Sequence, residues 1–578
     1  MKRKKFKYAI LLLLLFFTSN GLGFSQKLNI LVNGQQALLD STTNTFYATV
    51  QREGQDSVRA QIQVLKDNVA YGDGYWVDGC FYADGSTIKA DASIISHVVV
   101  PEVNENCTAD TCRLVLTYLP LVVIDYAANQ KLEKDHDTPA NITIYDTQDW
   151  TEGNVFTSPI MISLRGATAS MMAKKSYSVA LIDDKGDENE KKLFNIRKTD
   201  KWIMDAAAID YSRMRNRVAF DVWNDISSLR DEDMKRNGTQ GQYCELMING
   251  RYCGLYCFSD KINRSLLGLK KTKADDPQKA IHGLLYKCTG ASYNNHLLTK
   301  NEPELPMNSE IWGDFEMKYP DNYFCNETWG PLANVIEQTN VLSASEDSVE
   351  TLMKCFYAEN FYEYAVFAMS FMLTDNVMHN TYLSIYDYEN DPRIWITPWD
   401  LDGSLGRDGA ALKLDRVAQA WMVYQNCHPF RYYYDNCVEP FMSNYQETWN
   451  RLSIGSLSVA HVSSVIDHYT QLFDKSGAWK RERERWDGMQ NVWYEGVPIN
   501  LAPTAAEEAQ YMKSWYKKNF LNIQSTITSS VPTIVDNANN NAKFSVYTLD
   551  GRKVNARVIK NLPTGIYLIN GQKILILK

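Results

Sequence analysis

Several familiar signatures of ligand binding are missing from this chain of 578 residues. It has no G-x-G-x-x-G and no G-x-x-x-x-G-K-[ST] segment, which excludes the common glycine-rich phosphate loops. It has no C-x-x-C and no closely spaced pair of histidines, which argues against a zinc site. After residue 17, no run approaches the roughly 18 apolar residues that a membrane-spanning helix needs. Its 60 basic residues are outnumbered by 69 acidic ones, for a net charge of −9, which argues against nucleic acid as a partner.

The first 25 residues are predicted to be a secretory signal peptide. A basic stretch at residues 2–7 precedes an apolar run from Tyr8 to Phe17 and the small residues Gly23 and Ser25, which is the order typical of such leaders. The apolar run is short for a membrane span. We therefore expect an exported protein, in the periplasm, at the cell surface or secreted, with no transmembrane segment in the mature chain.

The eleven cysteines are an odd number for a chain that is expected to leave the cytosol. Some of them are close neighbours in sequence, and disulfides are expected within some of these pairs, although sequence does not fix the connectivity. The candidate pairs are Cys107 with Cys112, Cys253 with Cys257, and Cys427 with Cys437.

The sequence predicts an α+β protein with three parts after the leader. Residues 26–150 contain several short strands without a long helical period, which favours a small Ig-like β-sandwich without catalytic residues. Residues 151–532 mix strands and helices. Residues 533–578 begin with an Asn-rich linker and continue with alternating apolar and polar residues around Asp-Gly and Asn-Gly turns, which indicates a small C-terminal β-module.

Three local patterns stand out in the central part. Apolar residues at helical spacing from Met214 to Val222 predict an amphipathic helix. Asn249-Gly250, between alternating apolar residues, predicts a β-hairpin. From about Ser348 to Phe371 a stretch without glycine or proline predicts one long helix, and further helices are expected between about Leu412 and Val531.

The most informative segment runs from Thr374 to Asp408. Its two runs TYLSIYDY and RIWITPW are rich in Tyr, Ile, Thr and Trp, and the turn-prone Asn390-Asp391 lies between them, which predicts an antiparallel hairpin. If the turn is centred there, Thr381 lies roughly opposite Asp400. The loop before the first strand and the loop after the second should then emerge at the same edge.

Four acidic and amide side chains occupy these two loops: Asp375, Asn380, Asp400 and Asp402. Their oxygens are ligands that Mg²⁺ prefers, and a remaining carboxylate can orient or deprotonate a hydroxyl. The competing interpretation is that Asp and Asn simply cap turns. A base, an asparagine five residues later and, after a hairpin, an aspartate follow the order of protein kinase catalytic loops, which favours metal or phosphate chemistry.

Phosphate chemistry also needs cations to neutralise the charge of the phosphate oxygens. The basic candidates, with the asparagine that adjoins one of them, are Arg165, Lys174, Lys175, Arg215, Asn216, Lys261 and Lys287.

Six segments in this order resemble the CotH kinase family, named for the spore coat protein H. They are LRGATASMMAKKSYSVAL, SRMRNRVAFDVW, LMINGRYCGLY, GLLYK, DNVMHNTYLSIY and ITPWDLDGSLGRD, and they cover roughly Ser158 to Asp408. The resemblance implies that residues 151–532 form an atypical protein-kinase-like domain. It also implies ATP-dependent phosphorylation of secreted or surface proteins, mainly on Ser, with ATP and Mg²⁺ as cofactors.

By position, the resemblance implies that Asp375 is the catalytic base and Asn380 a Mg²⁺ ligand. Asp400 resembles the metal-binding aspartate of the kinase DFG motif, and Asp402 is expected as a second acidic contact. The basic and amide positions that match the family pattern, expected to bind the nucleotide phosphates or to hold the site, are Arg165, Lys175, Arg215, Asn216 and Lys287.

Two other functions compete with this one. In the first, the chain is a catalytically inactive, kinase-like surface adaptor, since ATP is scarce outside the cytoplasm. In the second, it is a Ca²⁺-stabilised carbohydrate-associated protein built around Asp400-Leu401-Asp402-Gly403, although the remaining EF-hand ligands are missing. The C-terminal module resembles the sorting or anchoring domains of secreted Bacteroidetes proteins, which implies attachment to the cell surface.

Overall fold

We describe a computed structural model of the protein. The described residues are 28–53, 57–67, 69–101, 109–146, 155–229, 237–272, 281–289, 307–377, 379–425, 427–494, 496–529, 546–548, 553–554, 565–569 and 572–576. The predicted leader at 1–25 and the Asn-rich linker at 536–542 lie outside them. The chain divides into two compact units, Met1–Ile523 and Gln524–Lys578, each described here by itself.

Strands β1 to β12 form two six-stranded sheets of the first unit. The first sheet contains β1 (Leu28–Val32), β2 (Gln35–Gln36), β5 (Arg52–Glu53), β6 (Ser57–Lys66), β7 (Val69–Ala70) and β10 (Thr87–Asp91). The second contains β3 (Leu38–Asp40), β4 (Thr45–Thr49), β8 (Tyr75–Val77), β9 (Cys80–Tyr82), β11 (Ser96–Pro101) and β12 (Ala109–Thr117). Alternate residues of β6, from Val58 to Val64, are buried, and they meet apolar side chains of the second sheet in one hydrophobic core.

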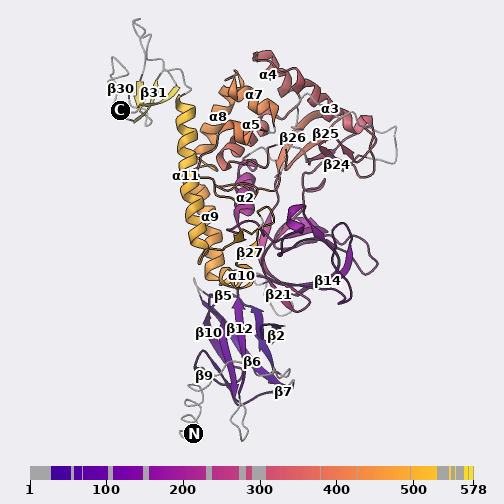
Figure 1. The fold of residues 1–578 in the computed structure, drawn as a ribbon, viewed down its shortest axis with the longest axis vertical. Helices are drawn as coiled ribbons and strands as arrows, with labels where there is room; N and C mark the ends of the chain where they lie inside the picture. Colours follow the sequence, from indigo (N-terminus) through magenta and orange to yellow (C-terminus); the bar gives the residue numbers. More distant parts are fainter. Residues whose placement is uncertain are drawn as a thin grey trace. The chain divides into compact units, whose positions relative to one another are not determined.

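A closed barrel follows these sheets (Figure 1). Its strands, in order around the barrel, are β13 (Leu121–Asp125), β14 (Thr138–Tyr145), β15 (Val155–Arg165), β16 (Ser176–Leu181), β19 (Lys201–Asp205), β21 (Arg251–Asp260) and β20 (Gly241–Ile248). Strands β13 and β14 thus pair within the barrel although they precede residue 150. The predicted hairpin is β20–β21, and its turn residues Asn249 and Gly250 have φ of 47° and 69°, the left-handed region that Asn-Gly turns supply.

A five-stranded sheet carries the segment that the sequence singled out. Its order is β23 (Ile311–Trp312), β24 (Phe315–Tyr319), β22 (Leu284–Cys288), β25 (Thr381–Asp387) and β26 (Asp391–Pro398). The predicted hairpin β25–β26 is confirmed, but its register differs from the expected one: Thr381 pairs with Pro398, two residues before Asp400. The reason is that Asp387 pairs with Asp391, which centres the turn on Glu389 and not between Asn390 and Asp391.

The described residues of this unit also form two small strand pairs. These are β17 (Lys191–Lys192) with β18 (Lys198–Thr199), and β27 (Met489–Gln490) with β28 (Pro498–Ile499).

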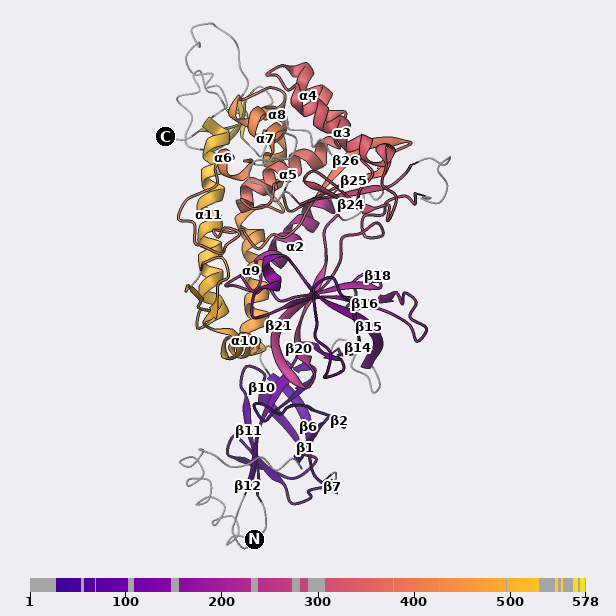
Figure 2. The ribbon, with the colours of Figure 1, turned by 45° about the vertical axis from the view of Figure 1, so that its right-hand side comes forward.

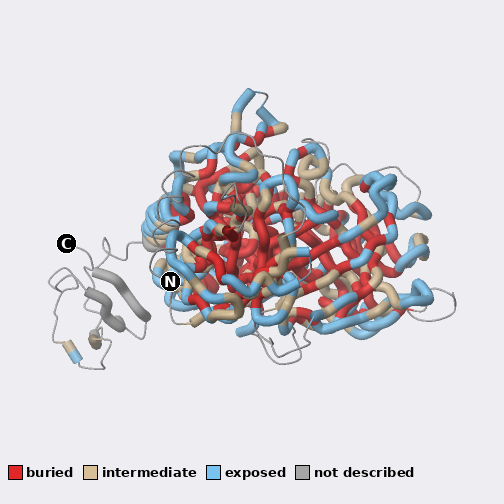
Figure 3. Tube along the Cα trace, turned by 90° about the horizontal axis from the view of Figure 1, so that it is seen from below, coloured by how far each residue is buried: buried red, intermediate tan, exposed pale blue. Residues whose placement is uncertain are grey.

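Helices pack beside the five-stranded sheet, where α5 contacts β26, and beside the barrel, where α10 contacts β21 (Figures 1 and 2). The predicted mixture of helices and sheets is therefore confirmed. They are α2 (Arg215–Ser227), α3 (Asn326–Asn340), α4 (Glu346–Met353), α5 (Ala358–Phe371), α6 (Ala420–Val423), α7 (His428–Asp435), α8 (Phe441–Ser453), α9 (Val459–Lys475), α10 (Ala478–Trp486) and α11 (Ala505–Ser529), with a short 3₁₀ turn, η1, at Thr168–Ser170. Helix α2 confirms the amphipathic segment predicted around Met214 to Val222. Buried chain concentrates in the interior of the first unit and exposed chain on its rim (Figure 3).

The single long helix expected from Ser348 to Phe371 is wrong, because the chain forms α4 and α5 with a break between them. In the break, the Tyr357 N–H donates to the Ile394 carbonyl and the Ile394 N–H donates to the Cys355 carbonyl, at 2.9 and 2.8 Å. Pairing with β26 therefore replaces the intrahelical hydrogen bonds at this point. Local propensity is overridden by a tertiary contact.

The disulfides expected within Cys253–Cys257 and Cys427–Cys437 are not formed, and Cys112 is also free. Cys253 and Cys257 both lie on β21, four residues apart along one strand, which separates them by about 13 Å, well beyond the roughly 7 Å limit for bridged Cα atoms. Cys427 and Cys437 flank α7, whose eight residues extend about 12 Å. Cys107 lies outside the described residues.

The second unit contains a four-stranded sheet in the order β30 (Lys553–Val554), β29 (Val546–Thr548), β31 (Gly565–Ile569) and β32 (Gln572–Ile576). Within the described parts of the chain, none of the helices combines the length and the apolar character that crossing a membrane requires.

Candidate active site

Several predicted site residues lie at or near the ends of strands of the barrel and of the five-stranded sheet. Arg165 is the last residue of β15, Lys261 follows β21, Lys287 lies in β22, Asn380 precedes β25, and Asp400 follows β26. Asp205, which the sequence reasoning did not single out, ends β19. Strand ends from two sheets thus supply both acidic and basic side chains to one region.

The two loops of the β25–β26 hairpin are joined directly. The Asn380 Nδ2 donates to the Asp375 carbonyl at 3.2 Å and to its Oδ2 at 3.3 Å. The Trp399 N–H donates to the Asn380 carbonyl at 3.0 Å. The convergence of Asp375, Asn380 and Asp400 at one edge, expected from the hairpin, is therefore present despite the shifted register.

Asn376 ties these loops together and was missed by the sequence reasoning. It is fully buried, and its Nδ2 donates to the carbonyls of Trp399 and, at 3.0 Å, Asp400. Its Oδ1 is buried without a hydrogen-bond partner among the described residues. Only its position next to Asp375 could have drawn attention to it. A buried amide oxygen that lacks a partner marks a place where a water molecule or another polar ligand completes the structure.

Asp400 adopts an uncommon backbone conformation that a second asparagine supports. Its φ is 57°, in the left-handed region that a residue other than glycine seldom adopts. The Leu401 N–H that follows it donates to the Asn216 Oδ1 at 3.0 Å, and the Asn216 Nδ2 donates to the Asp205 Oδ2 at 2.9 Å. Asn216, on α2, thus links Asp205 to the chain at Asp400, and its place is that of a residue that holds the site.

The carboxylates repel one another. Burial, followed by the charges of Asp400 and Asp408, raises the pKa of Asp375 to about 7. Burial and the charge of Asp205 raise the pKa of Asp400 against the opposing effect of Arg165 and Lys287. Asp375 and Asp400 are nevertheless exposed. Many protein atoms lie around each carboxylate, which raises its pKa, but a ligand can still reach it.

Asp402 shares this environment. It is partly exposed, and burial followed by the charges of Asp400, Asp210, Asp205 and Asp375 raises its pKa well above the ordinary value. We call Asp205, Asp375, Asp400 and Asp402 the acidic group. Asp205 was missed because nothing in its local sequence, the end of a strand, distinguishes it.

Basic side chains face the same region. Burial lowers the pKa of Lys287, with Lys318 and Arg165 adding to the effect and Glu316 and Asp400 opposing it. Burial, then Arg165 and Lys318, also lowers the pKa of Lys261. We call Arg165, Lys261, Lys287 and Lys318 the basic group. Mutual repulsion among clustered cations is relieved when an anion such as a phosphate binds.

Arg165 is oriented by an aromatic support. Its guanidinium lies 5.4 Å from the ring centroid of Trp399, which packs edge-on against Phe220 and Tyr382 at 6.0 and 5.9 Å. The face of an indole ring attracts a cation, so this contact restrains the position of the Arg165 guanidinium.

Two of the residues expected to bind phosphates or to hold the site have partners within the protein. Arg215 is completely buried and binds Asp210 and Glu508, both at 2.6 Å. The Lys175 Nζ donates to the Ser170 carbonyl at 2.8 Å, beside η1. Its neighbour Lys174 is also buried, in an ion pair of 2.8 Å with Glu482. Sequence could not reveal these partners, which lie up to about 300 positions away.

The acidic group offers oxygen ligands for a metal ion, but among the described residues these oxygens are not gathered as closely as in a preformed metal site. Among the described residues, His282, Asp387 and Glu389 have potential ligand atoms within 4.8 Å of one another, at the turn end of the hairpin. There Lys270 already binds Asp387 at 2.7 Å, which supplies the compensating charge. At the acidic group, burial and neighbouring carboxylates raise the pKa of Asp375, Asp400 and Asp402, although Arg165 and Lys287 oppose the shift of Asp400. The unbalanced oxygen donors therefore fit a divalent cation, and the adjacent basic group fits the phosphates of a nucleotide.

Comparison with models of known protein families gives a match over much of the chain. A model of the family described as CotH kinase protein matches residues 162–522, more than half of the chain. The matched range begins within β15 and ends within α11, and it includes every member of the acidic and basic groups. A search of curated proteins found no match.

Proposed function

The chain belongs to the CotH kinase family, and we propose that it is an exported atypical protein kinase that transfers the γ-phosphate of ATP to serine hydroxyls of secreted or surface proteins. The observation that carries the proposal is the pairing of an acidic group, whose Asp375 and Asp400 are exposed, with a basic group at the same strand ends. Phosphoryl transfer needs both halves, one for the metal and hydroxyl and one for the phosphates.

Asp375 is the proposed base. Its exposed carboxylate, steadied by the Asn380 amide at 3.3 Å, would accept a hydrogen bond from the serine hydroxyl and orient its oxygen toward the phosphorus. A raised pKa makes this carboxylate a better proton acceptor than an ordinary aspartate. Most of the rate would come from positioning and charge neutralisation, since the transfer needs no covalent enzyme intermediate.

Asn380, Asp400 and Asp402 are the proposed holders of Mg²⁺. When bound, Mg²⁺ neutralises phosphate oxygens and helps to hold them in line with the hydroxyl. Asn376 and Asn216 fix the backbone on either side of Asp400, so the carboxylate is preorganised. Arg165, Lys261 and Lys287 would bind the phosphates, which replaces the glycine-rich loop that the sequence lacks.

The remaining parts of the chain suit an exported kinase of this kind. We propose that the barrel and the helical part with the five-stranded sheet correspond to the two halves of a kinase-like domain, with the site where they meet. The two sheets from β1 to β12 would form an Ig-like sandwich, and the C-terminal sheet a module for attachment to the cell surface. The net charge of −9 favours protein substrates over nucleic acid.

One observation favours a second function, that of an inactive kinase-like adaptor at the cell surface. Asp375, Asp400 and Asp402 do not form a group within 4.8 Å, as a preformed all-carboxylate metal cage would. In this account the acidic group is a remnant, and the two terminal β-modules carry the function.

Calorimetry on the mature protein distinguishes the two. We expect ATP to bind in the presence of Mg²⁺, Asp400→Ala to abolish the Mg²⁺-dependent part, and Asp184→Ala, at an exposed turn far along the chain from the site, to behave as the parent. Intact-mass detection of phosphorylation should then follow the same ranking. Absence of nucleotide binding in the parent would favour the adaptor.

A further inference from the structure

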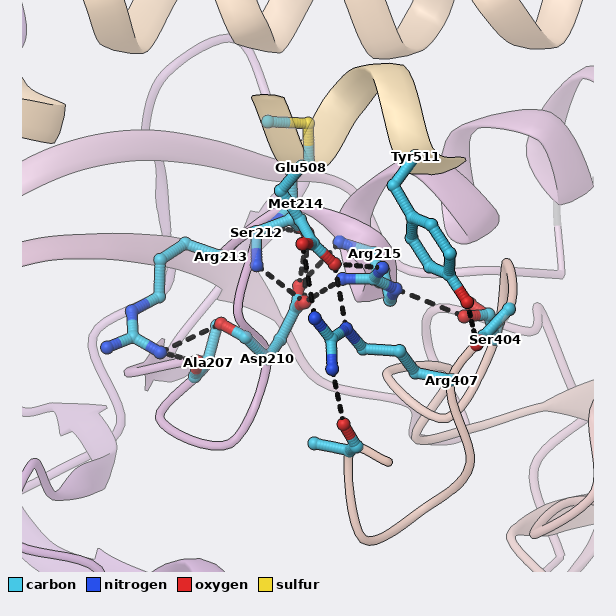
Figure 4. Close-up of polar contacts among 12 residues, drawn as sticks. Ala207, Asp210, Ser212, Arg213, Met214, Arg215, Ser404, Arg407, Glu508 and Tyr511 are labelled. Atoms are coloured by element: carbon cyan, nitrogen blue, oxygen red, sulfur yellow. Dashed lines mark hydrogen bonds and ion pairs between the residues drawn. The ribbon is translucent and has the colours of Figure 1, made fainter. Parts of the chain in front are cut away.

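A buried ion cluster joins α11 to the loop of residues 400–412, which we call the metal loop because it carries Asp400 and Asp402. The Glu508 Oε1 accepts hydrogen bonds from Arg215 at 2.6 Å and from Arg407 at 2.7 Å, and its Oε2 accepts from Arg407 at 3.1 Å (Figure 4). All three side chains are at most 7% exposed. Burial works to raise the pKa of Glu508, but Arg215 and Arg407 outweigh it and lower that pKa to about 2. The carboxylate therefore stays charged and keeps both arginines in place.

The two arginines pass this restraint to the backbone of the metal loop. The Arg215 Nε donates to the Ser404 carbonyl at 3.1 Å, and the Arg407 guanidinium donates to the Ala411 carbonyl at 2.6 Å. These contacts give two carbonyls of the irregular loop side-chain donors in addition to the loop's own backbone hydrogen bonds. The loop is thus shaped by side chains that converge on Glu508.

Helix α11 also contacts the metal loop directly. The Tyr511 hydroxyl donates to the Gly406 carbonyl at 2.6 Å. Gly406 has φ of 90°, and a Cβ there would lie 2.7 Å from the Trp515 ring, so only glycine allows α11 to pack this closely. Glu508, Tyr511 and Trp515 lie on successive turns of one helix face.

The metal loop in turn shapes the surroundings of Asp375. A Cβ at Gly409 would lie 2.8 Å from the Asp375 Cγ, and a Cβ at Gly403 would lie 2.9 Å from the Gly409 nitrogen. The loop backbone is therefore in direct contact with the proposed base. A shift of the loop would move Asp400 and Asp402 and open the space beside Asp375 at the same time.

We propose that Glu508 is a positioning residue for phosphoryl transfer: through Arg215 and Arg407 it holds the metal loop in the shape that presents Asp400 and Asp402 to Mg²⁺ and closes against Asp375. This inference rests on the proposed kinase function. It assigns to α11, which begins 93 positions after the end of the metal loop, a part in metal binding that the acidic group alone does not reveal.

Glu508→Gln in the mature protein is the direct test, because it removes the charge and keeps the size. Glu507→Gln is the matched control, since Glu507 is its exposed neighbour on the same helix. We expect Glu508→Gln to raise the Mg²⁺ concentration that half-saturates ATP binding by about 10- to 100-fold, as loss of an outer support of a metal site does. We also expect faster hydrogen–deuterium exchange at residues 403–412, and Glu507→Gln should leave both quantities at the parent's values.

Tyr511→Phe is the second variant, in case Glu508→Gln does not fold. It removes one hydroxyl from the same helix face and keeps the ring, so a smaller shift of the same two quantities is expected. Unchanged exchange of the metal loop in a folded Glu508→Gln protein would overturn the proposal, and so would a lower melting temperature with unchanged Mg²⁺ dependence. If the loop loosens while the parent itself binds no Mg²⁺ and ATP, the loop's dependence on Glu508 stands and the kinase function fails.

Discussion

Two groups of charges in this protein differ in whether they are compensated. In the buried cluster around Glu482, the carboxylate binds Lys174 and Arg213 at 2.8 Å each, and these cations outweigh burial and lower its pKa. In the acidic group, burial and like charge raise the pKa of Asp375 to about 7. The compensated charges around Glu482 hold the barrel, α2 and α10 together. Uncompensated charges of the second kind cost stability unless a ligand supplies the missing charge, which is the mark of a functional site.

The largest expected effect comes from removing a charge of the acidic group. Asp400→Ala should lower phosphoryl transfer by at least about 10²- to 10³-fold, because a group that stabilises charge in the transition state is lost. Its melting temperature should match or exceed that of the parent, since one repelling carboxylate has gone. Assays with labelled ATP and calorimetric melting measure the two. An active variant, or one that is clearly less stable, would contradict the contrast between the two groups.

Removing the compensated charge should have the opposite outcome. Glu482→Ala leaves Lys174 and Arg213 buried without their partner, which we expect to lower the free energy of unfolding by about 3–5 kcal/mol. Urea unfolding followed by tryptophan fluorescence measures the loss. The control is Glu484→Ala on the same helix, whose exposed ion pair with Arg113 should be worth less than about 1 kcal/mol. Equal losses in the two variants would show that burial of the pair does not matter.

The acidic group should also respond to pH in a way that the buried cluster does not. Asp375 has a pKa of about 7 in the folded protein, above the ordinary value of an unfolded aspartate. Its ionisation therefore destabilises the folded state at pH 8, and this penalty disappears as the pH falls below 7 toward the unfolded pKa. Asp375→Asn should raise the melting temperature of the metal-free protein at pH 8 but not at pH 4. A rise of equal size at pH 8 and at pH 4 would show that charge repulsion is not its cause.

The smallest expected effect concerns Asp387, a compensated carboxylate close to the surface. Burial tends to raise its pKa, but hydrogen bonds from Lys270, Asn390 and His282 outweigh burial and lower the pKa to about 2. Because this is below the unfolded value, the pairing stabilises the protein above about pH 4 and is lost as the pH falls through 2. Lys270→Met should therefore cost much less stability than Glu482→Ala, and the cost should shrink between pH 4 and pH 2 in acid unfolding curves. A cost that stays constant over that range would mean that the lysine acts by packing alone.

Elements with a strong local pattern were predictable. The hairpins β20–β21 and β25–β26 follow from Asn249-Gly250 and from β-branched and aromatic runs, and α2 follows from its apolar spacing. One error arose where a distant contact overrode a local preference. Ile394 pairs with the chain between α4 and α5 and divides the expected helix. The error in the hairpin register has a local cause instead, because Asp387 pairs with Asp391 and centres the turn on Glu389.

The candidate site divides in the same way. The family pattern and the hairpin drew attention to Asp375, Asn380 and Asp400, since they flank one element. Asp205 and Asn376 were missed because each has an ordinary local sequence and gains its place from contacts across the fold. Arg215 was expected to bind phosphates or to hold the site, because the sequence does not show whether the partner of a basic residue is a ligand or a carboxylate of the same chain; in the structure Arg215 binds Glu508.

The sequence by itself determined the types of chemistry present: acids and amides at both ends of one hairpin, basic residues upstream, and no glycine-rich phosphate loop. Only the tertiary structure decided which of these charges are free to act. Arg215 and Glu508 are 293 positions apart in the chain and 2.6 Å apart in space, whereas Asp375 and Asp400 are nearer in sequence and the charge of Asp400 raises the pKa of Asp375. The physical reason is that compensation of a charge depends on distance and burial in three dimensions, and neither follows from order along the chain.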